Sequence, residues 1–161
     1  MQVTVREGDD VLVHDLEAGS IGKDLFPKQS GMVAAVVNGV SVDLDSELRD
    51  GDEVSGVHLS SGEGLAILRH SAAHVAAQAT QKLIPSAKLG IGPPITDGFY
   101  YEFDLPESLK PEDLEEIEKQ MVLIIKSRQR FSRRVVTRDQ ALAELTHEPY
   151  KLRLIGADSG A

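Results

Sequence analysis

The sequence predicts an α+β protein in two parts, residues 1–61 and residues 62–161, and three observations lead to this fold class. Residues 1–61 alternate apolar and polar positions in short runs that turn residues separate, which is typical of strands joined in hairpins. Residues 62–161 contain two long stretches with apolar residues at helical spacing. Between the two parts, Ser60-Ser61-Gly62-Glu63-Gly64 is small and polar, as a boundary between domains usually is.

In residues 1–61 we expect two hairpins, one helix and a final strand. The hairpin turns are expected at residues 7–10 and at Asn38-Gly39, a dipeptide that is the strongest short signal for a hairpin. A short helix is expected over residues 20–26, because a proline follows it, and the final strand over residues 54–59. This spacing predicts a β-grasp, ubiquitin-like fold, in which a helix crosses one face of a small mixed sheet. A small SH3-like barrel is the alternative.

In residues 62–161 we expect a mixed α+β domain that begins with a long helix. The expected elements are a helix over 63–83, a hairpin of 88–91 and 99–103, a helix that starts at Pro111, a strand over 133–136, a short helix over 138–145 and a last strand over 150–155. Residues 156–161 are small and polar and add no closing element. We therefore expect this domain to be incomplete at its C-terminal end.

The composition is that of a folded protein without disulfides. Of the 161 residues, 41% are hydrophobic and 27% charged, and there is no cysteine, which excludes disulfides and thiolate metal sites within the chain. Residues 1–60 hold 12 acidic and 4 basic residues, and the rest holds 14 and 13. The acidic total argues against a protein that binds nucleic acid over its whole surface, but not against a local basic patch. No apolar run reaches the length of a membrane span and no signal peptide is recognisable, so we expect a cytoplasmic protein without membrane partners.

The helix over residues 63–83 carries two histidines, His70 and His74, one turn apart on the same side. Alanines surround them where a surface helix would carry charges, so we expect a shallow pocket above small side chains. Two imidazoles at this spacing suit two tasks: binding a metal together with further ligands, or holding and deprotonating a water molecule. The alternative is a pair of core histidines satisfied by hydrogen bonds. The glutamate that follows the first histidine in zinc peptidase helices is absent.

Three further groups of residues are candidates for binding. Tyr101 lies in an alternating aromatic stretch near the stiff turn Gly92-Pro93-Pro94, where it either lines a ligand pocket or fills the core. Lys151 shares an expected strand face with Arg153, a pattern that by itself predicts only a polar outer face. A run of basic residues without an acid either contacts phosphates or is a solvated helix end. This run consists of Lys126, Arg128, Arg130, Arg133, Arg134 and Arg138.

Three of these motifs, in the same order, resemble threonyl-tRNA synthetases of the bacterial type. Arg69-His70-Ser71-Ala72-Ala73-His74 resembles the H-S-x-A-H helix of that family, and residues 91–101 resemble the segment that follows it. Pro149-Tyr150-Lys151-Leu152 resembles a later Y-K strand. Residues 1–61 are similar to the β-grasp TGS domain that precedes these motifs. The resemblance covers essentially the whole chain, as a TGS domain over 1–61 and most of an editing domain over 62–161.

In that family the editing domain hydrolyses serine that has been attached wrongly to threonine tRNA. Serine lacks one methyl group of threonine, which is worth only about 1–3 kcal/mol in a binding pocket, so a second site is needed. The resemblance implies two sets of site residues. The catalytic set is His70, His74 and Lys151, and the substrate-binding set is Tyr101, Gly92 and Pro93. Candidates for RNA contacts are Arg128, Arg130, Arg133 and Arg134. No metal is expected in this chain, and a metal-dependent site would use His70 and His74.

The resemblance also implies features that lie outside this chain. The family completes its editing site with a later D-x-C-R-G-P-H-like segment, which has no counterpart here, so we expect the chain alone to be inactive or weakly active. The expected partner is the acceptor arm of tRNA. No cofactor is expected in the chain, whereas the aminoacylation core is expected to use ATP with magnesium and a zinc ion and to form a homodimer. The alternatives are an RNA-binding module without chemistry and a metal-dependent deacylase, because alanyl-tRNA synthetase editing domains share the H-x-x-x-H helix.

Overall fold

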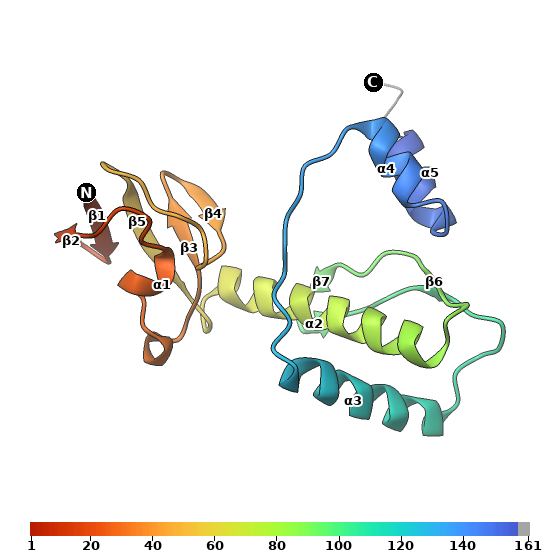
Figure 1. Ribbon diagram of the computed structural model, residues 1–161. Helices are drawn as coiled ribbons and strands as arrows, with labels where there is room; N and C mark the ends of the chain where they lie inside the picture. Colours follow the sequence, from red (N-terminus) through yellow and green to blue (C-terminus); the bar gives the residue numbers. More distant parts are fainter. Residues whose placement is uncertain (158–161) are drawn as a thin grey trace. The chain divides into compact units, whose positions relative to one another are not determined.

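The computed structural model describes residues 1–157 and divides the chain into two compact units (Figure 1). The first unit comprises residues 1–68, and the second begins at Arg69. The division falls inside the long helix α2 (Gly62–Leu83), whereas the boundary expected from composition lies at the start of that helix. Within residues 1–157, no helix is both long enough and apolar enough to cross a membrane.

The first unit is built on a five-stranded mixed sheet in the order β2-β1-β5-β3-β4. The strands are β1 (Gln2–Glu7), β2 (Asp10–Asp15), β3 (Met32–Val37), β4 (Val40–Val42) and β5 (Glu53–His58). Both hairpins pair antiparallel, while β1 and β5 lie parallel in the middle of the sheet. Two hairpins joined through a parallel central pair form a β-grasp sheet. This confirms the α+β class and the β-grasp prediction over the SH3-like alternative.

Local chemistry explains the turns of this sheet. The β3–β4 turn places Asn38 and Gly39 at φ 51° and 81°, the left-handed backbone that the two central residues of such a hairpin need. Helix α1 (Gly22–Leu25) is shorter than the helix expected over residues 20–26, because Phe26 already leaves helical geometry ahead of Pro27. A buried cluster closes one face of the sheet. Its members are Val3, Val5, Phe26, Ala35, Leu48 and Val54.

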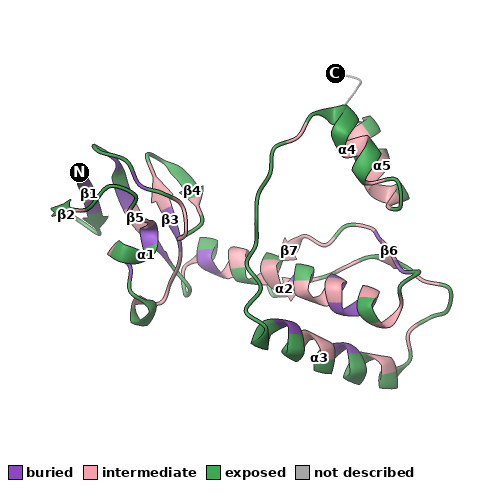
Figure 2. Cartoon of the chain, viewed as in Figure 1, coloured by how far each residue is buried: buried purple, intermediate pink, exposed green. Residues whose placement is uncertain are grey.

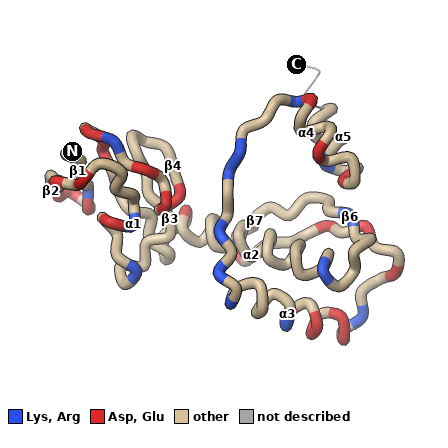
Figure 3. Tube along the Cα trace, viewed as in Figure 1, with Lys and Arg blue, Asp and Glu red and all other residues tan. Residues whose placement is uncertain are grey.

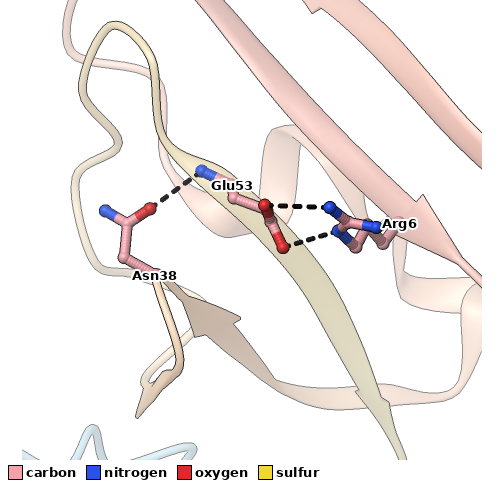
Figure 4. Close-up of polar contacts among 3 residues, drawn as sticks. All are labelled: Arg6, Asn38 and Glu53. Carbon is pink, nitrogen blue, oxygen red and sulfur yellow. Dashed lines mark hydrogen bonds and ion pairs between the residues drawn. The ribbon is translucent and has the colours of Figure 1, made fainter.

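Polar contacts fix the centre of the same sheet (Figure 4). The backbone N–H of Glu53 donates to Asn38 Oδ1 at 3.0 Å, and the Asn38 amide donates to Asp52 at 2.8 Å. The Glu53 carboxylate accepts two hydrogen bonds from the Arg6 guanidinium, at 2.5 and 3.2 Å. Asn38 therefore ties the β3–β4 turn to β5, and Arg6 ties β1 to β5 across their parallel pairing.

The second unit is held together by two long helices. Helix α3 (Pro111–Lys126) packs Ile117 and Ile124 against Ala79 of α2, and Figure 2 shows the buried positions of α3 on the side that faces α2. Proline in the first turn and early acids suit the start of α3, as its sequence predicts. Two short antiparallel pairs follow α2. They join β6 (Lys88–Leu89) to β9 (Phe103–Asp104) and β7 (Pro94–Ile95) to β8 (Gly98–Phe99).

Two predicted strands of the second unit are wrong. Residues 150–155 form part of helix α5 (Pro149–Ala157), because Pro149 is suited to a first helical turn and the apolar alternation is too short to fix a period of two. On a helix, Lys151 and Arg153 lie on opposite sides and do not share a face. Residues 133–136 are extended but pair with no strand among residues 1–157, and Val135 is 79% exposed. The predicted short helix α4 (Arg138–Glu144) is present.

Candidate active site

The two histidines of α2 contact each other directly. Their Nε2 atoms lie 3.1 Å apart, and the rings meet edge to face with centroids 4.6 Å apart. Both side chains are exposed, while Ala73 and Ala77 between and beside them are buried. Other parts of the second unit therefore already cover the alanines, and the imidazoles are left at the surface. In this contact one Nε2 must carry a hydrogen and the other must not, so both rings cannot be imidazolium at once.

His74 is biased towards its neutral form. Partial burial lowers its pKa, and the positive charges of His70 and Lys151 lower it further. A neutral imidazole at neutral pH can accept a proton, which is what a general base requires. The charge of Lys151 acts on His74 although Lys151 belongs to α5, far along the chain. The structure thus places His70 against His74, and Lys151 near enough for its charge to act on His74.

A surface hollow of about 520 Å³ lies beside His74. Its lining comes mainly from one face of α2 and consists of His74, Ala77, Gln78, Gln81, Lys82, Leu89 and Phe131. The Phe131 ring meets the His74 ring at an angle, with centroids 6.2 Å apart, and Phe131 is 63% exposed. The helical pattern of α2 could not predict this contact, because Phe131 belongs to the segment after α3.

Tyr101 and Gly92 form one packed wall of the same unit. The Tyr101 ring stacks on Phe103, with centroids 4.8 Å apart. A Cβ atom on Gly92 would lie 2.1 Å from the Tyr101 ring, so only glycine fits there. Burial and the negative charge of Glu148 raise the pKa of Tyr101, which keeps its phenol protonated at neutral pH. The structure therefore joins two of the three predicted substrate-binding residues, and Pro93 follows directly in the chain.

Comparison with known proteins decides the family. No family model matches the chain. A threonine–tRNA ligase of Streptomyces griseus subsp. griseus is 51% identical over all of this chain, which spans 24% of that relative. A threonine–tRNA ligase of Thermobifida fusca is 60% identical over 81% of the chain and 20% of the relative. The chain belongs to the threonine–tRNA ligase family. It spans about a quarter of the length of the curated relatives it matches and corresponds to their N-terminal region.

In this member of the threonine–tRNA ligase family, the predicted RNA-contacting arginines follow one exposed segment. Figure 3 shows basic residues along the chain that leads from α3 to α4. Arg128, Arg130, Arg133 and Arg134 are all exposed. Arg128 and Arg130 line a second hollow of about 410 Å³ together with Phe131, whereas Arg134 pairs with Glu144 on α4. The segment therefore offers positive charge next to the surface that carries His74.

The metal question concerns the same histidines. Among residues 1–157 no group of three or more histidine, cysteine, aspartate or glutamate side chains is placed to hold a metal ion. His70 and His74 could provide two ligands. Structural zinc sites use four protein ligands, and catalytic zinc sites use three protein ligands and a water molecule. A metal ion bound by His70 and His74 would therefore need further ligands from other residues.

Proposed function

We propose that the second unit hydrolyses the ester that links serine to threonine tRNA, as the proofreading part of a threonine–tRNA ligase. The observation that carries this proposal is the grouping of two contacting imidazoles with the charge of Lys151, in which the pKa of His74 is lowered. Such a group combines a neutral base with a fixed positive charge. Ester hydrolysis by water needs both, because a proton must leave the water while negative charge develops on the carbonyl oxygen.

The tautomers of the two rings follow from the direction of their hydrogen bond. We take His74 to donate its Nε2–H to Nε2 of His70, which leaves Nδ1 of His74 without a hydrogen and able to accept one. His70 then carries its hydrogen on Nδ1 and can donate it to the substrate. By accepting the hydrogen bond from His74, His70 orients the His74 ring as the base.

In the proposed reaction, the oxygen of a water molecule attacks the ester carbonyl carbon and gives a proton to Nδ1 of His74. The Lys151 ammonium stabilises the negative charge on the carbonyl oxygen. The bond between the carbonyl carbon and the ribose oxygen then breaks, and the proton moves from His74 to that oxygen. The products are serine and a tRNA with a free terminal hydroxyl. We assign the exclusion of the extra methyl of threonine to the wall of Gly92, Pro93 and Tyr101.

The relatives are about four times as long as this chain. We propose that the complete enzyme works in the cytoplasm and joins threonine to tRNA in a core that uses ATP with magnesium and a zinc ion. That core would also form the homodimer. Within the chain, we assign recognition of the tRNA acceptor arm to the β-grasp unit and to the arginine segment after α3.

The experiment measures serine release from serylated threonine tRNA. It uses the chain alone and a chimera in which the chain replaces the matching region of the Streptomyces griseus relative. The chimera is expected to release serine about 10- to 200-fold faster than it releases threonine from threonyl-tRNA, which is the discrimination that one methyl allows. Serine release by the chimera at the spontaneous rate would exclude the proposal. The chain alone is expected to be slower, because the family completes its site with a later segment.

One observation favours a second function, RNA binding without chemistry. Residues 126–138 hold six basic residues and no acid, and all six are exposed. Binding through phosphates weakens steeply with salt. If the chain binds tRNA at low salt while the chimera leaves seryl-tRNA intact, this second function replaces the first.

A further inference from the structure

Glu148 is the last residue before α5, and its carboxylate joins three elements of the second unit. Oε1 accepts a hydrogen bond from the Gln81 side-chain amide of α2 at 2.9 Å. Oε2 accepts one from the backbone N–H of Leu89 in β6 at 3.0 Å. Gln81 is fixed in turn, because its Nε2 also donates to the carbonyl oxygen of Ala87 at 3.1 Å. We call the bonds of Glu148 to Gln81 and Leu89 the Glu148 clamp.

The same residue starts the helix that carries Lys151. The backbone carbonyl of Glu148 accepts a hydrogen bond from the N–H of Leu152 at 3.1 Å, which forms the first turn of α5. Lys151 lies in that turn, three residues after Glu148. Because the turn is rigid, the position of the Glu148 backbone sets the position of the Lys151 backbone. The clamp and the lysine are therefore mechanically linked.

On α2, the clamp is attached to the face that carries His74. Gln81 follows His74 by seven residues, which is close to two helical turns, so both side chains leave the helix on the same side. Both also line the hollow beside His74. The clamp thus joins the start of α5 to the face of α2 that carries His74. The lowering of the His74 pKa by the Lys151 charge agrees with this arrangement.

We propose that Glu148 is a positioning residue of the hydrolytic site, which holds Lys151 beside His74 through the Glu148 clamp. The inference rests on the proposed function for its consequence in catalysis, but the geometry itself can be tested separately. Apart from the clamp, α5 is tied by the Tyr150 hydroxyl, which donates to Asp104 of β9 at 2.8 Å. That bond ties the helix to β9, the strand paired with β6, and does not involve α2.

The test compares Glu148→Gln and Gln81→Ala with two controls. Glu144→Gln makes the same chemical change on α4, where the carboxylate pairs with Arg134 away from the histidines. Tyr150→Phe removes a tie of α5 that does not involve Glu148 and shows what loosening of the helix does by itself. Circular dichroism and the midpoint of thermal unfolding first establish that each variant is folded. Gln81→Ala breaks the clamp from the α2 side, so the test survives if one clamp variant fails to fold.

The first readout is the pKa of His74, measured by NMR in the chain. His74 faces His70 on its own helix, Lys151 on α5 and Lys82 on the rim of the hollow, and Arg130 lies in the adjoining segment. Release of Lys151 removes one neighbouring positive charge, so the pKa of His74 is expected to rise in both clamp variants, towards its value in Lys151→Met. It is expected to stay unchanged in Glu144→Gln. An unchanged pKa of His74 in both folded clamp variants would overturn the inference.

The second readout is seryl-tRNA hydrolysis by the chimera. The clamp variants are expected to lose about 10- to 100-fold in kcat, as misplacement of a catalytic group does, with little change in KM. Equal losses in Tyr150→Phe would assign the effect to general loosening and contradict a specific role for Glu148. A chimera that hydrolyses seryl-tRNA equally well with and without the clamp overturns the inference and leaves the function standing. Absence of hydrolysis in the unmodified chimera excludes the function, and the pKa readout still decides whether the clamp exists.

Discussion

The Nε2 atoms of His70 and His74 lie 3.1 Å apart on the exposed side of α2, so the two rings share a single hydrogen. This contact divides the roles that the sequence left undivided. His74 is the ring whose pKa is lowered by burial and by the charges of His70 and Lys151. In the proposed hydrolysis we therefore assign the role of base to His74 and the role of orienting partner to His70.

Removal of His74 tests this division most directly. In the chimera, His74→Ala is expected to lower the rate of serine release by about 10²- to 10⁴-fold, which is the usual contribution of a general base. His70→Ala is expected to lower it less, because the base remains but loses its orienting contact. His147→Ala serves as the control, since His147 lies exposed in the turn after α4. A larger loss in His70→Ala than in His74→Ala would reverse the two roles.

The pKa of His74 also predicts how stability depends on pH. The folded chain holds this pKa below the ordinary value of 6.5, so the unfolded chain takes up the proton at a higher pH. The unfolded state then binds more protons as the pH falls through 6.5, and the free energy of unfolding decreases in that range. Urea unfolding of the chain between pH 7.5 and about pH 5 measures the decrease. In His74→Gln this part of the decrease is expected to disappear, and an equally steep dependence there would contradict the lowered pKa.

The sequence predicted the relative position of His70 and His74 better than it predicted the element that carries Lys151. Helical spacing placed His70 and His74 on one side of α2, because a period of 3.6 is well defined over a helix of this length. The six residues from Tyr150 to Ile155 were too few to distinguish a strand from a helix, although Pro149 ahead of them favoured a helix start. Residues such as Lys151 were named from a resemblance, and their proximity to His74 depends on contacts between distant segments.

The contacts of Glu148 show what a single sequence cannot supply. A glutamate before a proline carries no pattern, and its partners Gln81 and Leu89 lie far away in the chain. The same holds for Phe131, which reads as a lone aromatic residue among arginines and proves to contact His74. The first unit could be predicted from local signals. The Asn38-Gly39 turn and the alternating strands indicate the β-grasp order that the structure shows.

Gly92 is predicted to be intolerant of any side chain. In Gly92→Ala the new Cβ would clash with the Tyr101 ring, which is backed by Phe103 and cannot move away freely. The expected loss is about 1–3 kcal/mol in the free energy of unfolding, as for overpacking elsewhere. Gly156→Ala is the matched control, because that glycine lies in helix α5 with open space around it. Chemical denaturation measures the free energy of unfolding of both variants. Equal stability of Gly92→Ala and Gly156→Ala would contradict the packing argument.

Asn38 is predicted to contribute more to the stability of the first unit than the nearby ion pair between Arg6 and Glu53. Its side chain bridges the β3–β4 turn to Glu53 and Asp52, and its backbone has a positive φ that alanine resists. Asn38→Ala is expected to cost about 1–3 kcal/mol in the free energy of unfolding. Arg6→Met removes the ion pair with Glu53, which is exposed, so its effect is expected to be smaller. A larger loss in Arg6→Met would show that the surface pair, and not the turn, secures β5.

The arginines between α3 and α4 are predicted to contact phosphates of tRNA. Each phosphate contact releases a bound counterion, so the logarithm of the binding constant falls linearly with the logarithm of the salt concentration. Replacing Arg130 and Arg133 together by glutamine is expected to weaken tRNA binding at low salt and to reduce that slope by about one for each lost contact. Lys119→Gln is the control, because Lys119 is exposed on α3 and pairs with Glu116. Titrations of tRNA at several salt concentrations measure this slope for each variant. A slope unchanged by the double replacement would place the RNA contacts elsewhere. An equal effect of Lys119→Gln would mean that positive charge anywhere on this unit contributes alike.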